Sequence, residues 1–425
     1  MKKIQFWSLL LGLTFGSLAF TACSNDDDDS GDGGNTPPPA ETEITGTWKI
    51  DLTTKTKTYD NVEAEMTYSE TMEFNADGTF QAQNTFTDYH QSSTKYEGVW
   101  KKLGTDKVVV ELKSKVNIDD KGTPVPDQYF KAHNDTLGYF FKGNAVFCES
   151  VVNSGYFAYT RDGKLPFSGY SDYSNNPIVG SWIGEDFAWD GTPITNRLEL
   201  RKDGTYIQTM DNHQGWSEGT AGYYILDGNR MMLISYYFLS KMGSQTNDWE
   251  VVGYRMWGGE WNVFSLEENN TILRNSGADS MGEMPFMVRE GKQLGTSFLG
   301  KWYNNHTLYD GKNTPEDEYW VIENTSIKHW WVTNGQFREG AVGTYSTTTR
   351  TDQYTGNEVT VLVCHWNNWL VDSGDNLNPA VGQETGRGES DYEVPYVYSK
   401  VSDVLLTQWP NQYGNGEYLR FKRMK

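Results

Sequence analysis

The chain has 425 residues, a length that allows two or three domains of ordinary size. Its formal charge of -21 at pH 7 would repel phosphates, so nucleic acid is not expected as a partner. Aromatic residues make up 14% of the chain, and 43 glycines stand against 13 prolines, which favours strands and tight turns over long helices. The composition therefore predicts an all-β protein.

The N-terminus has the pattern of a signal peptide. Two lysines precede an apolar run over residues 4–20, which is slightly short for a membrane span and is followed by acidic residues. Residues 21–23 read Thr-Ala-Cys and resemble the lipobox of bacterial lipoproteins, although Phe20 stands where that motif usually has Leu. The resemblance implies that residues 1–22 are removed and that Cys23 carries the lipid. The alternative is an ordinary secreted protein with an unused cysteine.

Residues 23–43 are expected to form an acidic tether. Residues 24–43 contain seven acidic side chains and no basic one, together with several prolines and glycines, so no core can form there. The acidic cluster directly after Cys23 resembles the export signal that sends lipoproteins of the Bacteroidota to the outer face of the outer membrane. That resemblance implies a lipid-anchored, surface-exposed protein of the outer membrane, whereas a plain acidic linker is the alternative.

The rest of the chain repeats one unit three times. A Gly-x-Trp motif recurs at intervals of 134 and 120 residues. About thirty residues after the motif, the first two copies join two apolar stretches through an Asp-Gly turn, which predicts a β-hairpin, and the third copy has Asn-Thr-Ser there. A Gly-x-aromatic element follows in each copy. The predicted units cover residues 44–165, 177–292 and 297–425.

The arginine on the last strand of each unit is informative. Residues 44–165 contain thirteen lysines and a single arginine, Arg161, so this position requires a guanidinium rather than a positive charge alone. Strand alternation places Arg161 on the core face with Phe157 and Tyr159. A guanidinium can stack on an indole while it donates to carbonyl groups, which an ammonium cannot do. We therefore expect three structural pairs, namely Trp48 with Arg161, Trp182 with Arg289, and Trp302 with Arg423.

The Gly-x-Trp on the first strand, the meander of about 120 residues and the closing arginine together resemble the lipocalin-like, or calycin, group. The resemblance implies three tandem antiparallel up-and-down β-barrels, each able to hold one small ligand. The competing architecture is an immunoglobulin-like sandwich, whose unit is usually nearer about 100 residues and gives no reason for the arginine.

The connections between the units differ in length. Residues 166–176 have the composition of a linker, whereas only residues 293–297 separate the second unit from the third. We therefore expect the second and third units to pack together, with the first unit as a spacer.

The sequence predicts no enzyme, no cofactor and no metal site. A serine nucleophile elbow and a dinucleotide fingerprint are absent, and a phosphate-loop spacing at residues 295–301 lacks the hydroxyl that would hold magnesium. His306, His329 and His365 lack the close pairing of metal ligands. A glycoside hydrolase is the less favoured alternative, because 57 acidic residues will always supply some carboxylate pair. Cys148 and Cys364 are expected to be buried free thiols.

The distribution of tryptophan is the main clue to function. The first unit has two tryptophans, the second has six and the third has seven. Residues 257–261 and 366–369 are predicted to be loops that present indoles beside amide or carboxylate groups, and Trp330 and Trp331 must point to opposite faces of a strand. Indole faces stack on sugar rings while polar neighbours bind hydroxyl groups. The predicted ligand-binding residues are Trp257, Trp261, Trp330, Trp331, Trp366 and Trp369.

The favoured hypothesis is a surface-anchored, non-enzymatic lipoprotein that binds a ligand, with a glycan as the favoured class, through its second and third units. The alternative is a structural or interaction protein of the cell envelope, in which the tryptophans contact another protein. A third interpretation is that these tryptophans pack between the second and third units.

Overall fold

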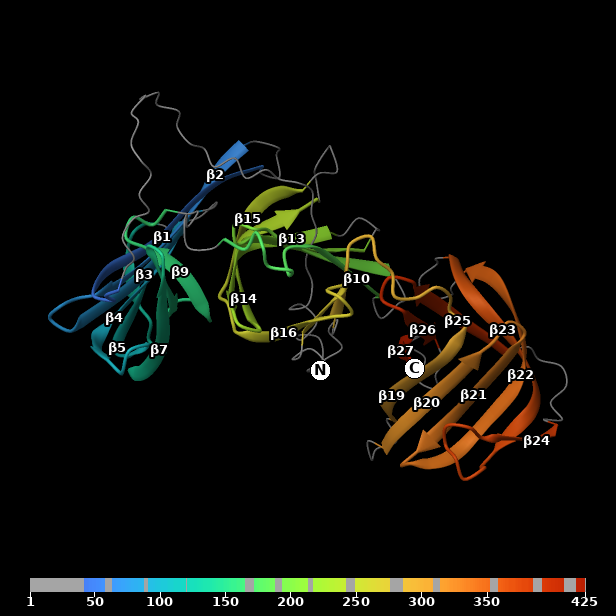
Figure 1. Cartoon of the computed structure of the whole chain (residues 1–425). Coiled ribbons are helices and arrows are strands. Elements are labelled where there is room, and N and C mark those ends of the chain that lie inside the picture. The colour runs from blue at the N-terminus through green and yellow to red at the C-terminus, as the bar shows by residue number, and fades with distance from the viewer. Residues whose placement is uncertain are drawn as a thin grey trace. The chain divides into compact units, whose positions relative to one another are not determined.

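The computed structural model describes residues 42–57, 63–87, 91–119, 121–164, 172–187, 193–212, 217–241, 249–275, 286–308, 314–351, 358–384, 392–408 and 418–424. Within these ranges the regular structure consists of β-strands without any helix (Figure 1). The described part of the chain therefore contains no helix that is long and apolar enough to cross a membrane. The predicted signal peptide, Cys23 and the tether up to residue 41 lie outside the described residues.

The strands form three sheets with the same topology. In each sheet, eight strands follow one another in an antiparallel meander, and the sheet closes because the first strand pairs with the last. A ninth, inserted strand pairs with the second half of the fifth barrel strand. The chain is thus three closed eight-stranded β-barrels in tandem. The predicted all-β fold of tandem barrels is confirmed, and the sandwich alternative is wrong.

The first barrel begins at the first Gly-x-Trp motif and has β6 as its inserted strand. Its strands are β1 (Gly46–Lys57), β2 (Glu63–Phe74), β3 (Thr79–Thr87), β4 (Gln91–Lys102), β5 (Lys107–Ile118), β6 (Pro124–Pro126), β7 (His133–Lys142), β8 (Ala145–Glu149) and β9 (Tyr156–Thr160).

The second barrel has β15 as its inserted strand. Its strands are β10 (Gly180–Phe187), β11 (Pro193–Leu200), β12 (Thr205–Asp211), β13 (Ser217–Asp227), β14 (Arg230–Ser240), β15 (Glu250–Trp257), β16 (Asn262–Glu267), β17 (Ile272–Asn275) and β18 (Phe286–Arg289).

The third barrel has β24 as its inserted strand. Its strands are β19 (Gly300–Leu308), β20 (Thr314–Ile322), β21 (Ser326–Thr333), β22 (Gln336–Thr351), β23 (Glu358–Val371), β24 (Ala380–Glu384), β25 (Tyr392–Ser399), β26 (Val404–Gln408) and β27 (Tyr418–Arg423).

A β-bulge between the fourth and fifth strands recurs in all three barrels. At each bulge one residue of the fourth strand is a glycine, on which a Cβ atom would collide with a carbonyl oxygen of the fifth strand. The bulge turns the fifth strand so that its second half pairs with the inserted strand. The recurring Gly-x-aromatic element of the sequence therefore marks this bulge, at Gly98, Gly222 and Gly343.

A buried tryptophan closes one end of each barrel, which we call the proximal end. The side chains of Trp48, Trp182 and Trp302 are fully buried, and each indole donates to the carbonyl four residues earlier at 2.7 to 2.8 Å. The guanidinium carbon of Arg161 lies 3.6 Å from the ring centroid of Trp48, and that of Arg423 lies 4.2 Å from Trp302. In the second barrel, Arg289 ends β18.

Each of these two guanidinium groups also donates to backbone carbonyls near the start of its barrel. Arg161 donates to the carbonyls of Glu43, Thr45 and Thr47. Arg423 donates to those of Ser297 and Leu299. The arginine therefore joins the last strand to the backbone just before and within the first strand.

The first barrel and most of the second form one compact unit, and the third barrel forms another together with residues 183–195 and 286–292 of the second barrel. Apolar side chains on the outer face of β13 and β14 join the core of the first barrel. The hydroxyl of Tyr236 accepts from the backbone N–H of Ala158 at 3.0 Å and donates to its carbonyl at 3.2 Å. The expectation that the first unit is a separate spacer is therefore wrong, because β13 and β14 are apolar on their outer face as well.

Candidate functional site

The interior of the third barrel divides into an apolar half and a polar half. Around Trp302 the interior is filled by buried apolar side chains. Toward the opposite end, which we call the distal end, polar side chains of β19 to β22 replace them. These residues, the distal cluster, are Asn304, His306, Glu316, Glu318, His329, Trp331, Thr333 and Arg338.

Strand register explains why carboxylates lie inside this barrel. Glu316 and Glu318 alternate along β20 with Trp320, whose side chain is fully buried in the core. Across the sheet, Glu318 lies opposite Trp331 and Glu316 lies opposite Thr333. The exposed fractions of Glu316 and Glu318 are only 2% and 1%.

Glu316 is held by three neighbouring side chains. It accepts a hydrogen bond from Thr333 at 2.9 Å and one from Arg338 at 2.8 Å, and His306 Nε2 lies 3.4 Å away. Burial acts to raise the pKa of Glu316, but the hydrogen bonds from His306, Arg338 and Thr333 outweigh it and hold this pKa below its usual value. Glu316 is therefore a carboxylate at neutral pH.

Glu318 and His329 form a buried pair beside two indoles. His329 Nε2 lies 2.7 Å from Glu318 Oε1, which also accepts from Trp320 Nε1 at 3.1 Å. The imidazole is stacked on Trp320 with a centroid separation of 3.8 Å, and Trp331 meets it edge-on at 4.0 Å. Burial holds the pKa of His329 below its usual value, although Glu318 acts in the opposite direction. A neutral His329 then donates from Nε2 to Glu318.

Three of the six predicted ligand-binding tryptophans come together at the distal end. The ring of Trp366 lies 6.4 Å from both Trp320 and His329, and it is half-buried like Trp331. Because of the bulge at Gly343, Trp369 also points to the interior side, where it is 37% exposed. Residues 366–369 were expected to form a loop, but they lie within β23, whose second half pairs with β24.

Trp330 lies on the outer face of the third barrel. Its indole is stacked on Tyr319 with a centroid separation of 5.1 Å and donates to the carbonyl of Asn376 at 2.8 Å. With Val332 and Leu370 these rings form a second apolar cluster in which Trp330 is only 3% exposed. Trp330 is therefore a packing residue of this outer cluster.

The segment of residues 257–261 contributes to the contact between the first and second barrels. Gly259 forms a two-way backbone bridge with Tyr156 of the first barrel. The ring of Trp261 packs on Phe140 of the same barrel at a centroid separation of 5.9 Å. Trp257 is 44% exposed, with the guanidinium carbon of Arg255 4.5 Å from its ring centroid.

The first barrel has a buried carboxylate at the same strand position. Gly46 lies opposite Phe74 and Gly300 lies opposite Ile322, so Glu70 and Glu318 are equivalent. Glu70 is fully buried. It accepts hydrogen bonds of 2.5 to 2.9 Å from the side chains of Tyr68, Ser150, Asn153 and Tyr159.

The distal end of the first barrel is apolar and is covered by the second barrel. Tyr68 and Phe86 occupy the positions that Glu316 and Thr333 have in the third barrel. The ring of Tyr254, from β15, packs against both at centroid separations of 6.2 and 6.1 Å. Its hydroxyl donates to the carbonyl of Met66 at 2.9 Å. The polar distal end of the third barrel therefore differs in kind from that of the first.

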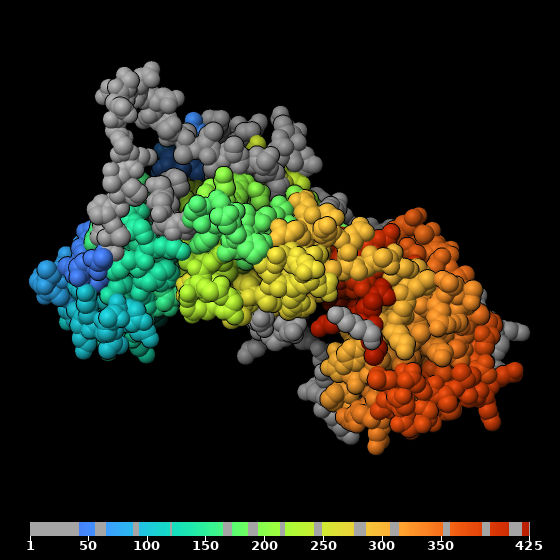
Figure 2. Space-filling model, viewed as in Figure 1, coloured from blue at the N-terminus to red at the C-terminus, as the bar shows by residue number. Residues whose placement is uncertain are grey.

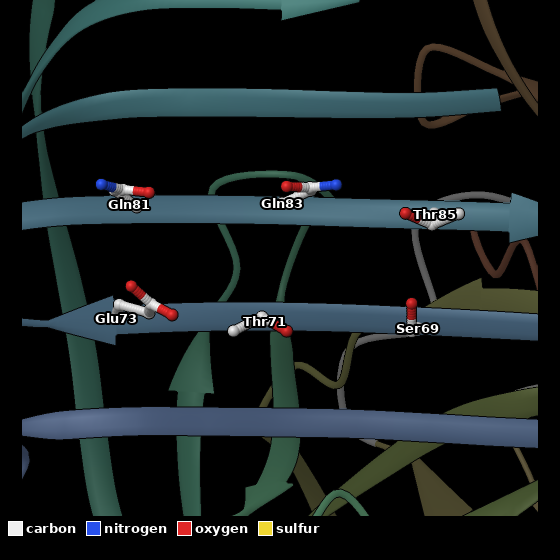
Figure 3. Close-up of a pocket in the computed structure, with 6 residues that line it drawn as sticks. All are labelled: Ser69, Thr71, Glu73, Gln81, Gln83 and Thr85. Carbon is white, nitrogen blue, oxygen red and sulfur yellow. The ribbon is translucent and has the colours of Figure 1, made fainter. Parts of the chain in front are cut away.

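The first two barrels each carry one shallow groove. A polar groove of about 240 Å³ runs over β2 and β3, where three cross-strand pairs project outward as Figure 3 shows: Ser69 with Thr85, Thr71 with Gln83, and Glu73 with Gln81. A groove of about 410 Å³ lies beside β14, β16 and β17 of the second barrel. None of the predicted ligand-binding tryptophans lines either groove.

Metal and thiol chemistry have little support in the described residues. Within these ranges no group of three or more His, Cys, Asp or Glu side chains is placed to hold a metal ion. Cys148 and Cys364 are buried and are not joined in a disulfide, as expected, and burial raises the pKa of the Cys148 thiol.

Comparison with known proteins gives no family for this chain. No protein family is matched by the sequence, and no curated protein matches it. The solved structures that it matches include a crystal structure of a DnaN sliding clamp (DNA polymerase III subunit beta) from Bartonella birtlesii bound to griselimycin. The sequence identity is 10%, the match covers 89% of this chain and 91% of that chain, and the TM-score is 0.13. A TM-score this low carries no argument about fold or function.

Proposed function

We propose that this protein is a lipid-anchored, surface-exposed lipoprotein of the outer membrane, whose third barrel binds a carbohydrate at its distal end without cleaving it. The observation that carries the proposal is the group of Trp331, Trp366 and Trp369 beside buried, hydrogen-bonded carboxylates. Indole faces match the C–H faces of sugar rings, and fixed polar groups next to them match hydroxyl groups.

The architecture supports the same proposal. Each barrel is an eight-stranded up-and-down meander, and a Gly-x-Trp motif opens it. An arginine at the C-terminal end of the last strand or directly after it covers that tryptophan in the first and third barrels. These features resemble the lipocalin-like group, whose barrels can hold one small ligand. The proximal end is closed by the tryptophan, which leaves the distal end as the side for recognition.

The carbohydrate test is a titration of the mature chain, residues 23–425, with a glycan panel followed by tryptophan fluorescence. Trp369→Ala should weaken binding about tenfold, which corresponds to the loss of about 1.4 kcal/mol from one stacking contact. Trp257→Ala is the matched control, because it removes a similarly exposed indole from the second barrel. The proposal would be contradicted if no glycan changed the fluorescence, or if both variants lost the same amount of affinity for the glycan.

Binding without catalysis is proposed because the distal carboxylates are poorly suited to acid catalysis. The pKa of Glu316 is held below its usual value, whereas a general acid needs a raised one. Incubation of the mature chain with each bound glycan should release no reducing sugar. Release that disappears in Glu316→Gln would instead identify a glycoside hydrolase.

The lipid anchor rests on the sequence, because Cys23 lies outside the described residues. Cys23→Ala should move the protein from the membrane fraction to the soluble fraction of the cell. Protease treatment of intact cells should degrade the wild-type protein if it is displayed outside. Unchanged fractionation of the variant would contradict the anchor.

A protein partner is the second candidate function, and one observation favours it. Four exposed apolar side chains belong to the hairpin of β23 and β24, which is orange-red at the surface in Figure 2: Trp369, Val371, Leu377 and Val381. The inserted strand of the second barrel, β15, is covered by the first barrel. A partner protein recovered with the wild type and lost with Val381→Asp, together with no sugar binding, would favour this function.

A further inference from the structure

We propose that the sugar recognised at the distal end of the third barrel carries no negative charge, and that the pairing of Arg338 with two carboxylates selects against acidic sugars. This inference rests on the proposed function, because it names the class of sugar bound at the same site.

Arg338 is the cation of the distal cluster, and its guanidinium is held by two carboxylates. Nη1 lies 2.8 Å from Glu316, and Nη2 lies 3.2 Å from Glu339. The side chain of Arg338 is 46% exposed, so an incoming ligand can reach it. The two carboxylates already neutralise the charge of the guanidinium, so a uronate carboxylate gains less from it than from an unpaired cation. A bidentate contact to both Nη atoms would also compete with Glu316 and Glu339 for the same edge of the guanidinium.

The two histidines of the cluster are also directed at protein acceptors. His306 Nδ1 lies 3.0 Å from Asn304 Oδ1, and its Nε2 faces Glu316. The amide of Asn304 donates to the carbonyl of Arg420, so its oxygen is the atom that faces His306. His329 faces Glu318, and burial keeps its pKa low. The guanidinium of Arg338 and the imidazoles of His306 and His329 thus already face acceptors within the protein.

Two buried carboxylates add a negative potential at the same end. Glu316 and Glu318 are almost fully buried, where charges are screened less than in water. An anionic sugar would approach these charges at a cost, whereas a neutral sugar would not. Neutral hydroxyl groups can still bind to carboxylate oxygens, which accept several hydrogen bonds each. Among the residues that the structure describes, the distal cluster therefore combines stacking surfaces with acceptors, and its guanidinium is already paired with carboxylates.

The test uses the full mature chain and pairs of oligosaccharides that differ only in oxidation at C6. Gluco-, galacto- and manno-oligosaccharides are compared with the corresponding uronic acid oligosaccharides by fluorescence titration or calorimetry. Each neutral member that binds should do so at least about tenfold more tightly than its acidic counterpart. Glu339→Gln removes one carboxylate partner of Arg338. It should lower the ratio of the affinity for the neutral sugar to the affinity for the uronate about fivefold.

Glu323→Gln is the matched control, because Glu323 lies at the turn between β20 and β21 near the proximal end and should leave the ratio unchanged. Equal or tighter binding of the uronates by the wild type would overturn the inference while the proposed function stands. An unchanged ratio in Glu339→Gln would overturn the role of Arg338. If no sugar binds, both the inference and the proposed function are overturned.

Discussion

Charged side chains inside the barrels are fixed by several partners at once. Arg161 contacts an indole and three backbone carbonyls. Glu70 accepts from four side chains, and Glu316 has three partners. A buried charge with all of its partners is tolerated, whereas the removal of one partner leaves a desolvated group unpaired. Substitutions at these residues should therefore lower the free energy of unfolding by more than the number of atoms removed would indicate.

Arg161→Lys should destabilise the first barrel by about 2 kcal/mol. Lysine keeps the charge, but an ammonium cannot stack on Trp48 and reach three carbonyls together. Urea denaturation of the mature chain measures the effect. Lys107→Arg, at the exposed start of β5, is the control and should change the free energy of unfolding by less than about 0.5 kcal/mol. A change in Arg161→Lys as small as that would contradict the role of the stacked guanidinium.

His329 should make the stability of the third barrel depend on pH. The usual pKa of 6.5 applies to the unfolded chain, whereas burial lowers the pKa in the folded barrel. As the pH falls below about 6.5, the unfolded chain therefore binds the proton first, and the free energy of unfolding falls until the folded-state pKa is reached. Hydrogen exchange of β20 and β21 should accelerate between pH 7 and pH 5, after correction for the intrinsic rate.

His329→Gln tests the origin of that dependence. The variant should be less stable at pH 7, because it loses the imidazole stacked on Trp320. Its corrected exchange rates should change less between pH 7 and pH 5 than those of the wild type. Glu316, which faces the same space, is expected to titrate below this range, because its hydrogen bonds hold its pKa below the usual value. If the corrected exchange rates of the variant and the wild type changed equally between pH 7 and pH 5, His329 would not be the titrating group.

The sequence predicted the tryptophans of the distal end but not its carboxylates. Glutamate is usually exposed, and 57 acidic residues gave no reason to select a few of them. A signal was present in the alternation of β2, where Glu70 shares a phase with Met66, Tyr68, Met72 and Phe74. The alternation of β20 places Glu318 with Trp320 and Ile322 in the same way. A glutamate at one of the alternating strand positions that are otherwise apolar is thus the sequence pattern that would predict a buried carboxylate.

At the scale of the elements, the bulged fifth strand and the inserted strand that pairs with it act together. The bulge reverses which residues of the fifth strand face inward, so Trp366 and Trp369 lie on one side although three positions separate them. The same bulge in the second barrel leaves Tyr236 as the extra residue, which reaches the first barrel. The same β-bulge therefore positions residues of the candidate site in the third barrel and residues of the interface with the first barrel in the second.

Gly343→Ala should destabilise the third barrel by about 3 kcal/mol, because the new Cβ would collide with the carbonyl oxygen of His365. The variant should also weaken sugar binding, because relief of the collision moves Trp366. Thermal denaturation and the glycan titration measure the two effects. Gly253→Ala is the control, because its Cβ would meet only the end of Met66 at 3.9 Å. Normal stability in Gly343→Ala would contradict this account of the bulge.

The inserted strands could not be predicted from the sequence, although the repeating barrel strands could. The motifs that repeat in the sequence lie where geometry demands one residue type, at the Asp-Gly turns, the bulge glycines and the proximal tryptophans. The inserted strands, in contrast, have 3, 8 and 5 residues and share no such position. β6 also has proline at both ends, which a strand prediction would reject.

At the scale of the whole molecule, the first two barrels should unfold together. Tyr236→Ala removes a fully buried ring and its two hydrogen bonds with Ala158, at a cost of about 3 to 5 kcal/mol. Hydrogen exchange should then accelerate in β9 of the first barrel as well as in β14 of the second. Tyr129→Ala, which removes a ring that is 82% exposed, is the control. Acceleration confined to β14 would show that the two barrels are independent.

The three-barrel organisation could be predicted from the repeated motifs, but the pairing of the first two barrels could not. Linker length was a poor guide, because an interface depends on which faces are apolar. The outer faces of β13 and β14 carry Tyr223, Ile225, Met232 and Ile234, which join the core of the first barrel. The apolar residues on both faces of these strands were thus the sequence signal that could have predicted the interface.

The cap that Tyr254 forms over the first barrel has a practical consequence for recombinant work. A fragment that ended in the linker after residue 165 would expose the rings of Tyr68 and Phe86 to solvent. Such a fragment should aggregate during expression. The shortest fragment expected to be soluble with the N-terminal barrel should instead include β18, which closes the second barrel, and should therefore end after Arg289. The first of the three similar barrels is therefore expected to be produced in soluble form only together with the second.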